Sequence, residues 1–193
     1  MVKRCDWAKG ELLSEYHDRE WGVIVFDDRI HFEQICLSGF QAGLSWELIL
    51  RKRPYLRRAF LRFDPARVSR LDSVEVSRIT GDQRGIRNIK KIKSVVNNAQ
   101  RFLDMQRQNK GSFSRYLFAQ LKNRAVSNDY HSWTEIPSRT KDSIKISNFL
   151  VKKGFTFCGP TIVYAYLQSI GFVEDHIKDC FRKKQLKKYK DSF

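Results

Sequence analysis

Apolar residues recur at helical spacing along most of this chain of 193 residues. In residues 29–38, for example, Ile30, Phe32, Ile35 and Leu37 fall largely on one side of a helix. Strict alternation of apolar and polar residues is rare, β-hairpin dipeptides are few and no segment is repeated. The pattern therefore predicts an all-α protein, with helices over residues 29–38, 45–52, 64–80 as two fragments, 87–109, 112–121, 139–153 and 160–171.

Several of these helices have recognisable ends. Ser45 is a candidate cap for the helix that begins after it, and Pro54 follows soon after its expected end. Asp64 and Pro65 form a good pair of cap and first-turn residue. The segment 160–171 runs from a proline to a glycine and is almost wholly apolar, so we expect it to lie in the core.

The chain is strongly basic, with 37 Lys and Arg against 21 Asp and Glu and a formal net charge of +16. Such an excess indicates nucleic acid or an acidic membrane surface as partner, while a basic surface kept for solubility is the alternative. No apolar run approaches the roughly 20 residues that span a bilayer, and the N-terminus has no apolar signal-peptide core. We expect a cytoplasmic protein without a membrane span, whose cysteines are not a disulfide framework.

The length suits one compact domain, which we place at residues 1–181. The remaining segment, 182–193, carries six basic residues in the nine positions from Arg182 to Lys190. Because this segment can bury little, we expect a flexible basic tail that contacts phosphates with little specificity.

Two cysteines and two histidines near the chain ends form a candidate metal set. Cys5 and His17 lie near the N-terminus. His176 and Cys180 stand four residues apart and so share one helical face. Two thiolates and two imidazoles are the ligands of a closed, non-catalytic zinc site, which would tie the chain ends together. From spacing alone, ordinary surface histidines are the alternative.

Large aromatic residues gather in the first quarter of the chain, namely Trp7, Tyr16, Trp21 and Trp46, with Phe40 nearby. They are either core residues or faces on which a nucleobase stacks, where each contact contributes about 1–3 kcal/mol. The basic net charge favours the second interpretation.

The stretch KKGFTFCGPT, residues 152–161, has the pattern of a helix-hairpin-helix element. Gly154 ends one helix, a short apolar hairpin follows, and Gly159 and Pro160 begin the next helix. Glycines let backbone N–H groups face a phosphate, and the helix N-terminus adds a partial positive charge. A tight interhelical turn without a ligand is the alternative.

Taken together, these residues resemble the 3-methyladenine DNA glycosylase I family. The matching stretches, in family order, are RCDW, YHDREWGV, FEQICLSGFQAGLSW, RFDPARV, GIRNIKKIKSVVNNA and KKGFTFCGPTIVYAYLQSIGFVEDH. The resemblance implies an all-α helix-hairpin-helix glycosylase fold, with that element at about residues 145–171. It also implies a monomer whose partner is double-stranded DNA containing alkylated bases. The implied ligands of a structural zinc are Cys5, His17, His176 and Cys180.

By this resemblance the enzyme flips a damaged nucleotide out of the duplex, because the reacting atom cannot be reached inside the stack. Trp46 would stack on the base, and Tyr16 would turn its hydroxyl toward it. Trp7 and Trp21 would form further walls. The enzyme would then hydrolyse the N-glycosidic bond of 3-methyladenine without a lyase step. Because N3-methylation makes adenine cationic and a good leaving group, positioning, stacking and desolvation can replace acid–base groups.

The contacts with DNA follow from the same resemblance. Gln41, Gly43 and Leu44 match the turn that enters the gap left by the flipped base, with Leu44 as the wedge. The residues expected to hold the DNA backbone are Lys153, Gly154, Gly159 and Thr161.

Ser38 stands at a candidate catalytic position where the family has a glutamate. That carboxylate would accept hydrogen bonds from the base and offset its charge, whereas serine keeps one acceptor without the charge. Two alternatives therefore stay open. One is a catalytically weak or inactive homologue that binds DNA or a modified base, and the other is a glycosylase for an uncharged modified base.

Glu174 stands two residues before His176, and related helix-hairpin-helix glycosylases place a catalytic aspartate two residues before a histidine. Glu174 could replace the missing carboxylate and stabilise positive charge on the sugar, or it could be an exposed glutamate beside a metal ligand. Asp175 is expected to support the zinc ligands.

Overall fold

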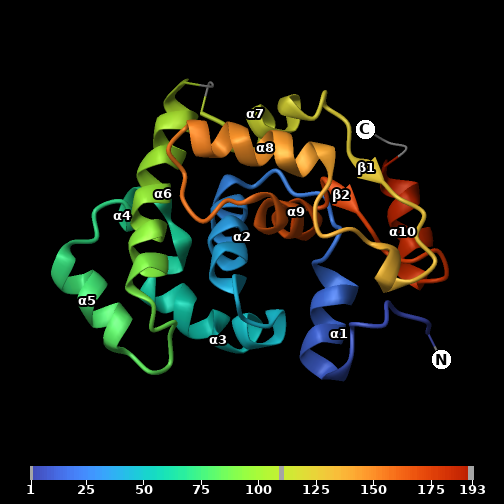
Figure 1. Ribbon diagram of the computed structural model, residues 1–193, viewed down its shortest axis with the longest axis horizontal. Coiled ribbons are helices and arrows are strands. Elements are labelled where there is room, and N and C mark those ends of the chain that lie inside the picture. The colour runs from blue at the N-terminus through green and yellow to red at the C-terminus, as the bar shows by residue number, and fades with distance from the viewer. Residues whose placement is uncertain (1, 109–110, 191–193) are drawn as a thin grey trace.

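The computed structural model describes residues 2–108 and 111–190, with side chains up to Leu186, and these residues are mostly helical (Figure 1). The α-helices are α1 (Gly10–Arg19), α2 (Asp28–Gln41), α3 (Trp46–Ala59), α4 (Pro65–Val68), α5 (Ser73–Gly81), α6 (Ile89–Gln108), α7 (Phe113–Gln120), α8 (Lys141–Lys152), α9 (Pro160–Ser169) and α10 (Phe181–Lys190). Two 3-10 helices are η1 (Leu61–Phe63) and η2 (Trp133–Glu135). A parallel ladder pairs β1 (Val126–Ser127) with β2 (Val173–Glu174), which the sequence pattern did not predict.

Helices α2 and α9 lie at the centre of the molecule and pack against each other (Figure 1). Helix α8 packs on α9, while α3 and α6 pack on α2. The predicted apolar segment 160–171 is therefore central, as expected. Among the described helices, none combines the length and the apolar character that crossing a membrane requires. The largest fully buried side chains are Tyr166, Phe32, Phe40, Phe60, Phe63, Phe102, Phe113 and Phe172.

Helix α3 begins where the sequence predicts but extends further. Ser45 Oγ accepts a hydrogen bond from Leu48 N at 3.2 Å, as an N-cap does. We expected the helix to end before Pro54, but it continues to Ala59. The packing of its inner face outweighs the backbone hydrogen bond that the proline removes. The side chains buried on that face are Ile49, Leu50, Arg53 and Leu56.

Helix α10 corrects the expectation of a flexible tail at residues 182–193. The chain is helical to Lys190, and both Lys183 and Leu186 are buried. Lys183 Nζ lies 2.9 Å from Glu174 Oε2, so the buried ammonium has a counter-charge that the sequence pattern did not reveal. Residues 191–193 lie outside the described part of the chain.

The first and last parts of the chain pack against each other (Figure 1). Phe181 N donates a hydrogen bond to Lys3 O at 3.0 Å. A second apolar cluster, separate from the main core, joins these ends to α3. Its buried members are Cys5, Tyr16, Trp21, Leu50, Ile177 and Cys180. The residues of α1, which the sequence pattern did not predict as a helix, are therefore fixed by tertiary contacts.

Gly171 lets the segment 22–25 pass directly over the end of α9. Its φ of +71° lies in the left-handed region, and Val25 N donates a hydrogen bond to Ile170 O at 3.2 Å. A Cβ atom at position 171 would lie 2.2 Å from the carbonyl carbon of Val23. A side chain there would force the two backbone segments apart.

We expect Gly171→Ala to lower the free energy of unfolding by about 2–5 kcal/mol, from the left-handed backbone and the collision together. Gly10→Ala is the matched control, because Gly10 has a similar φ of +77° but no atom within 4 Å of its Cβ position. That control should cost only about 1–2 kcal/mol. The measurement is denaturant unfolding followed by circular dichroism, and equal losses for the two variants would contradict the close approach.

Candidate active site

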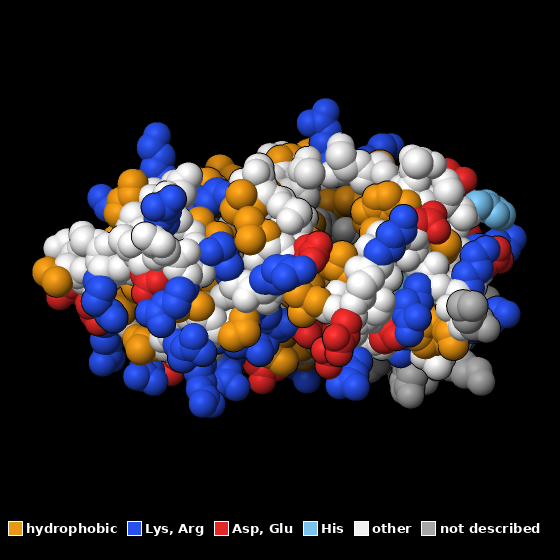
Figure 2. Space-filling view, turned by 90° about the horizontal axis from the view of Figure 1, so that it is seen from below, with side chains coloured by type: hydrophobic (Ala, Val, Ile, Leu, Met, Phe, Trp, Pro, Cys, Tyr) orange, Lys and Arg blue, Asp and Glu red, His pale blue; other side chains and the backbone are white. Residues whose placement is uncertain are grey.

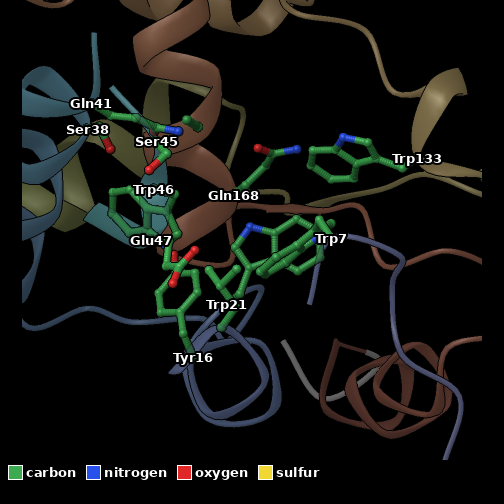
Figure 3. Close-up of a pocket in the computed structure, with 12 residues that line it drawn as sticks. Trp7, Tyr16, Trp21, Ser38, Gln41, Ser45, Trp46, Glu47, Trp133 and Gln168 are labelled. Carbon is green, nitrogen blue, oxygen red and sulfur yellow. The ribbon is translucent and has the colours of Figure 1, made fainter. Parts of the chain in front are cut away.

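A cavity of about 280 Å³ is bordered by residues of α1, α2, α3 and α9 (Figure 3). The structure brings most of the predicted base-binding residues together around it, although they come from distant parts of the sequence. The predicted residues that line it are Trp7, Tyr16, Trp21, Ser38, Gln41 and Trp46. The other lining residues are Leu13, Ser45, Glu47, Trp133, Ala165 and Gln168.

Aromatic rings form two groups around the cavity (Figure 3). Trp7 makes an edge contact with Trp21, with ring centroids 5.0 Å apart and planes at 83°, and lies 5.9 Å from Trp133. Tyr16 and Trp46 form the other group, with centroids 5.3 Å apart and planes at 55°. Their flat faces can hold a planar, electron-poor ring by stacking.

Trp133 lies in η2, within a polar segment far from the other tryptophans in sequence. It is 40% exposed even though it contacts Trp7 and Trp21. The one signal in the sequence was its residue type, because tryptophan is a common stacking face for nucleobases.

Several polar atoms around the cavity are buried without a hydrogen-bond partner among the described residues. They are the hydroxyl of Ser38 and the indole N–H groups of Trp7 and Trp46. Ser38 lies on α2 and is only 1% exposed. Because buried polar groups are nearly always paired, this arrangement suits a ligand that carries both donors and acceptors.

Tyr16 is a neutral member of this polar set. Burial raises the pKa of its phenol far above the ordinary value, since the charged phenolate is disfavoured away from water. The hydroxyl therefore stays protonated in the physiological range and can both donate and accept a hydrogen bond.

Asp175 orients a polar side chain of the cavity and does not touch the predicted metal ligands. Its carboxylate accepts hydrogen bonds from Gln168 Nε2 at 2.7 Å, from Tyr164 Oη at 2.5 Å and from Asn128 Nδ2 at 2.8 Å. The prediction that Asp175 supports the zinc ligands is therefore wrong. Since one amide hydrogen of Gln168 is committed to Asp175, the orientation of this side chain at the cavity is fixed.

The turn between α2 and α3 lies beside the cavity and is exposed. Gly43 has a φ of +73° with open space around its Cβ position, and Leu44 is 37% exposed. The buried Lys91 Nζ donates hydrogen bonds to Phe40 O at 2.8 Å and to Ala42 O at 2.5 Å. A positive charge thus satisfies carbonyl groups at the end of α2 and fixes the turn.

The surface around this turn is basic. A groove of about 540 Å³ lies on its other side, and Lys52, Arg87 and Lys91 contribute to its lining. Figure 2 shows Lys and Arg side chains spread over the face seen from below. These cations can attract a polyanion toward the exposed turn.

The connection between α8 and α9 follows the predicted course. Gly154 has a φ of +88° after the end of α8, and α9 begins at Pro160 after Gly159. Asn98 anchors the connection, because its Oδ1 accepts from Thr156 N at 2.8 Å and its Nδ2 donates to Thr156 O at 2.9 Å. The residues predicted to hold DNA, Lys153, Gly154, Gly159 and Thr161, all lie at this connection.

The four predicted metal ligands lie together and are buried. The donor atoms of Cys5, His17 and Cys180 lie within 4.8 Å of one another. The His176 ring centroid lies 4.8 Å from that of His17, and its Nε2 has no hydrogen-bond partner among the described residues. The hydrogen bond from Cys5 is the main cause that lowers the pKa of Cys180 to about 4, which favours a thiolate.

Acidic side chains hold the outer nitrogens of both histidines. His17 Nδ1 lies 2.8 Å from Asp18 Oδ1, and His176 Nδ1 lies 2.9 Å from Glu174 Oε1. Carboxylates in this position fix the ring orientation and leave each Nε2 for a metal ion. The two thiols, the Nε2 atom of His17 and the unpaired Nε2 atom of His176 therefore suit a four-coordinate zinc ion.

Glu174 is placed for this supporting role and not for catalysis at the cavity. It is 1% exposed, does not line the cavity, and accepts from Ser127 Oγ at 2.9 Å. Burial alone would raise its pKa, but hydrogen bonds from His176 and Lys183 lower the pKa to about 2. Both of the predicted alternatives, a charge facing the sugar and an exposed glutamate, disagree with this placement.

Comparison with known proteins agrees with the arrangement of these residues. The model of the family described as methyladenine glycosylase matches residues 7–183. The DNA-3-methyladenine glycosylase of Haemophilus influenzae is 36% identical over 181 residues, which cover 93% of this chain and 97% of that protein. DNA-3-methyladenine glycosylase 1 of Escherichia coli is 38% identical over 180 residues, with 93% and 96% covered.

Solved structures show the same similarity. A crystal structure of 3-methyladenine DNA glycosylase I superposes with a TM-score of 0.89 at 39% identity, covering 93% of this chain and 98% of that one. A second, with one tyrosine changed to phenylalanine and 3-methyladenine bound, gives 0.89 at 28% identity, covering 93% and 97%. Since the matches span nearly the whole chain, this protein belongs to the methyladenine glycosylase family.

Proposed function

We propose that this protein is a DNA-3-methyladenine glycosylase that acts on alkylated purines in double-stranded DNA. The observation that carries this proposal is the aromatic cavity with buried, unpaired polar atoms directly beside an exposed turn. Membership of the methyladenine glycosylase family and the 3-methyladenine complex of a relative support the same activity.

The exposed turn explains how the base would reach the cavity. Leu44 would enter the duplex and fill the gap left by the flipped nucleotide, while Gly43 lets the backbone approach closely. Gln41 lines the cavity at the other end of the turn. It would enter the gap together with Leu44. Lys91 would keep the turn rigid as the turn enters the base stack of the duplex. Its ammonium group donates hydrogen bonds to two carbonyl groups that precede Gly43.

The cavity would stabilise a cationic base as its bond to the sugar breaks. Trp46 and the tryptophans opposite it can contribute about 0.5–2 kcal/mol of cation–π attraction. The electron pair of the N-glycosidic bond moves into the ring, so the base leaves as a neutral molecule. Water then bonds to the sugar carbon and releases a proton, which leaves an abasic site without a lyase step.

The connection between α8 and α9 is proposed to act as a helix-hairpin-helix element that holds the DNA backbone. Gly154 and Gly159 leave the backbone of this connection open, and the N-terminus of α9 carries a partial positive charge. Lys153 and Thr161 flank it and can contact phosphate oxygens. All the groups invoked belong to one chain, so a monomer is sufficient for the reaction. Because the substrate is DNA, we expect the protein to act inside the cell.

Ser38 keeps an alternative open for experiment, namely a homologue that binds a modified base without releasing it. Family membership favours the enzyme. Release of the base from methylated DNA by the natural protein would support the proposed activity, and release only by Ser38→Glu would support the binding protein.

We further propose that a structural zinc ion is held by Cys5, His17, His176 and Cys180. It would link the two ends of the chain next to the walls of the cavity without touching the base. The support is the orphaned Nε2 of His176, the depressed pKa of Cys180 and the carboxylates behind both histidines.

Trp46→Ala tests the cavity as the site of base excision. Loss of one stacking face should reduce the rate of 3-methyladenine release from methylated DNA by roughly 5- to 150-fold, which corresponds to about 1–3 kcal/mol. The assay is single-turnover release of labelled base, with circular dichroism to establish that the variant is folded. An unchanged rate in a folded variant would place the reaction elsewhere.

Cys180→Ser tests the zinc site. The natural protein should contain one zinc ion per chain by elemental analysis, and the variant should lose it and unfold roughly 10 °C lower, from a loss of about 3–4 kcal/mol. Cys158→Ala is the matched control, because Cys158 is buried in the main core away from the cluster. Its zinc content should not change, and a metal-free natural protein would disprove the proposal.

A further inference from the structure

Glu47 is the carboxylate of the cavity. Among the described residues that line it, no other carries an acidic side chain. Glu47 directly follows Trp46 in the first turn of α3, and both side chains line the cavity (Figure 3). It therefore follows directly on one of the stacking faces of the cavity, that of Trp46.

Arg51 holds this carboxylate from outside the cavity. Its Nε and Nη2 donate to Glu47 Oε1 at 3.1 and 2.6 Å, one helical turn later. Both bonds end on the same oxygen, so Oε2 is left for another partner. The side chain of Glu47 is 44% exposed, which leaves its charge at the mouth of the cavity, partly screened by solvent.

The remaining polar groups of the cavity carry no negative charge. Ser38 offers a hydroxyl, Gln168 an amide, and burial keeps the phenol of Tyr16 protonated. A cationic purine that enters from DNA leaves the negative field of the phosphates and part of its hydration. Aromatic faces offset only part of that loss, so a nearby carboxylate would favour a charged base over a neutral one.

We propose that Glu47 is a specificity-determining residue that makes the cavity prefer positively charged purines. This role rests on the proposed base-excision function. The negative charge that balances the cationic purine is then the carboxylate of Glu47, at the mouth of the cavity. It explains how a cavity with the neutral Ser38 at its buried end can discriminate by charge.

The test compares two small ligands of similar shape. The ligand 3,9-dimethyladeninium carries a fixed positive charge, and free 3-methyladenine is used at a pH where it is neutral. Binding is followed by quenching of tryptophan fluorescence, which reports on the cavity because Trp7, Trp21, Trp46 and Trp133 all line it. Glu47→Gln should weaken binding of the cation roughly fivefold at low salt and leave the neutral base within about twofold.

Glu15→Gln is the matched control. Glu15 also forms an exposed pair with an arginine one helical turn later, with 3.1 Å between Glu15 Oε1 and Arg19 Nη1, but it does not line the cavity. This variant should bind both ligands like the natural protein. Adding Ser38→Glu to Glu47→Gln should restore the preference for the cation, because it supplies a carboxylate from the buried end.

Equal weakening of both ligands by Glu47→Gln, or no weakening, would overturn the proposal, as would a folded double variant that does not regain the preference. A separate measurement of base release from methylated DNA distinguishes failure of the Glu47 proposal from failure of the proposed glycosylase function. If the natural protein and Glu47→Gln release the base at the same rate, Glu47 has no role in specificity, but the protein is still a glycosylase. If the natural protein binds the cation more tightly than the neutral base but releases no base from DNA, the role of Glu47 stands and the proposed glycosylase activity is wrong.

Discussion

The packing of the chain's first residues against its last determines whether the aromatic cavity exists. Trp7, Tyr16 and Trp21 belong to the N-terminal segment, and the cluster that buries this segment includes Ile177 and Cys180. The short polar helix α1 has little intrinsic stability of its own, so these contacts hold one wall of the cavity in place. The other wall belongs to α2 and α3 and is anchored in the main core.

The cavity combines aromatic faces with neutral polar groups. This combination suits a substrate whose base is already a good leaving group. A nucleotide methylated at N3 of adenine is already a cation, so the protein gains more from holding it in a fixed, dry position than from supplying a strong acid. The hydroxyl of Ser38 and the indole N–H groups of Trp7 and Trp46 are buried without a protein partner among the described residues. These groups are therefore available to a base with matching acceptors and donors.

The sequence predicted the helical class, the cap at Ser45 and the family, which the family model confirms. Errors arose where tertiary contacts outweigh local preference. Packing carries α3 through Pro54, and a buried ion pair orders α10. The carboxylate behind His176 is that of Glu174 and not, as predicted, that of Asp175, because spacing alone cannot say which of two adjacent acidic side chains faces a histidine. Trp133 joins the cavity through contacts with Trp7 and Trp21, which lie more than a hundred residues away in the sequence.

The link between the chain ends also bears on how the protein is made. Trp7, Tyr16 and Trp21 leave the ribosome well before Cys180 and Ile177, which help to bury them. A growing chain is therefore strongly basic long before its binding site is complete. A nascent chain can therefore contact nucleic acid through its charge before this wall of the aromatic cavity is fixed.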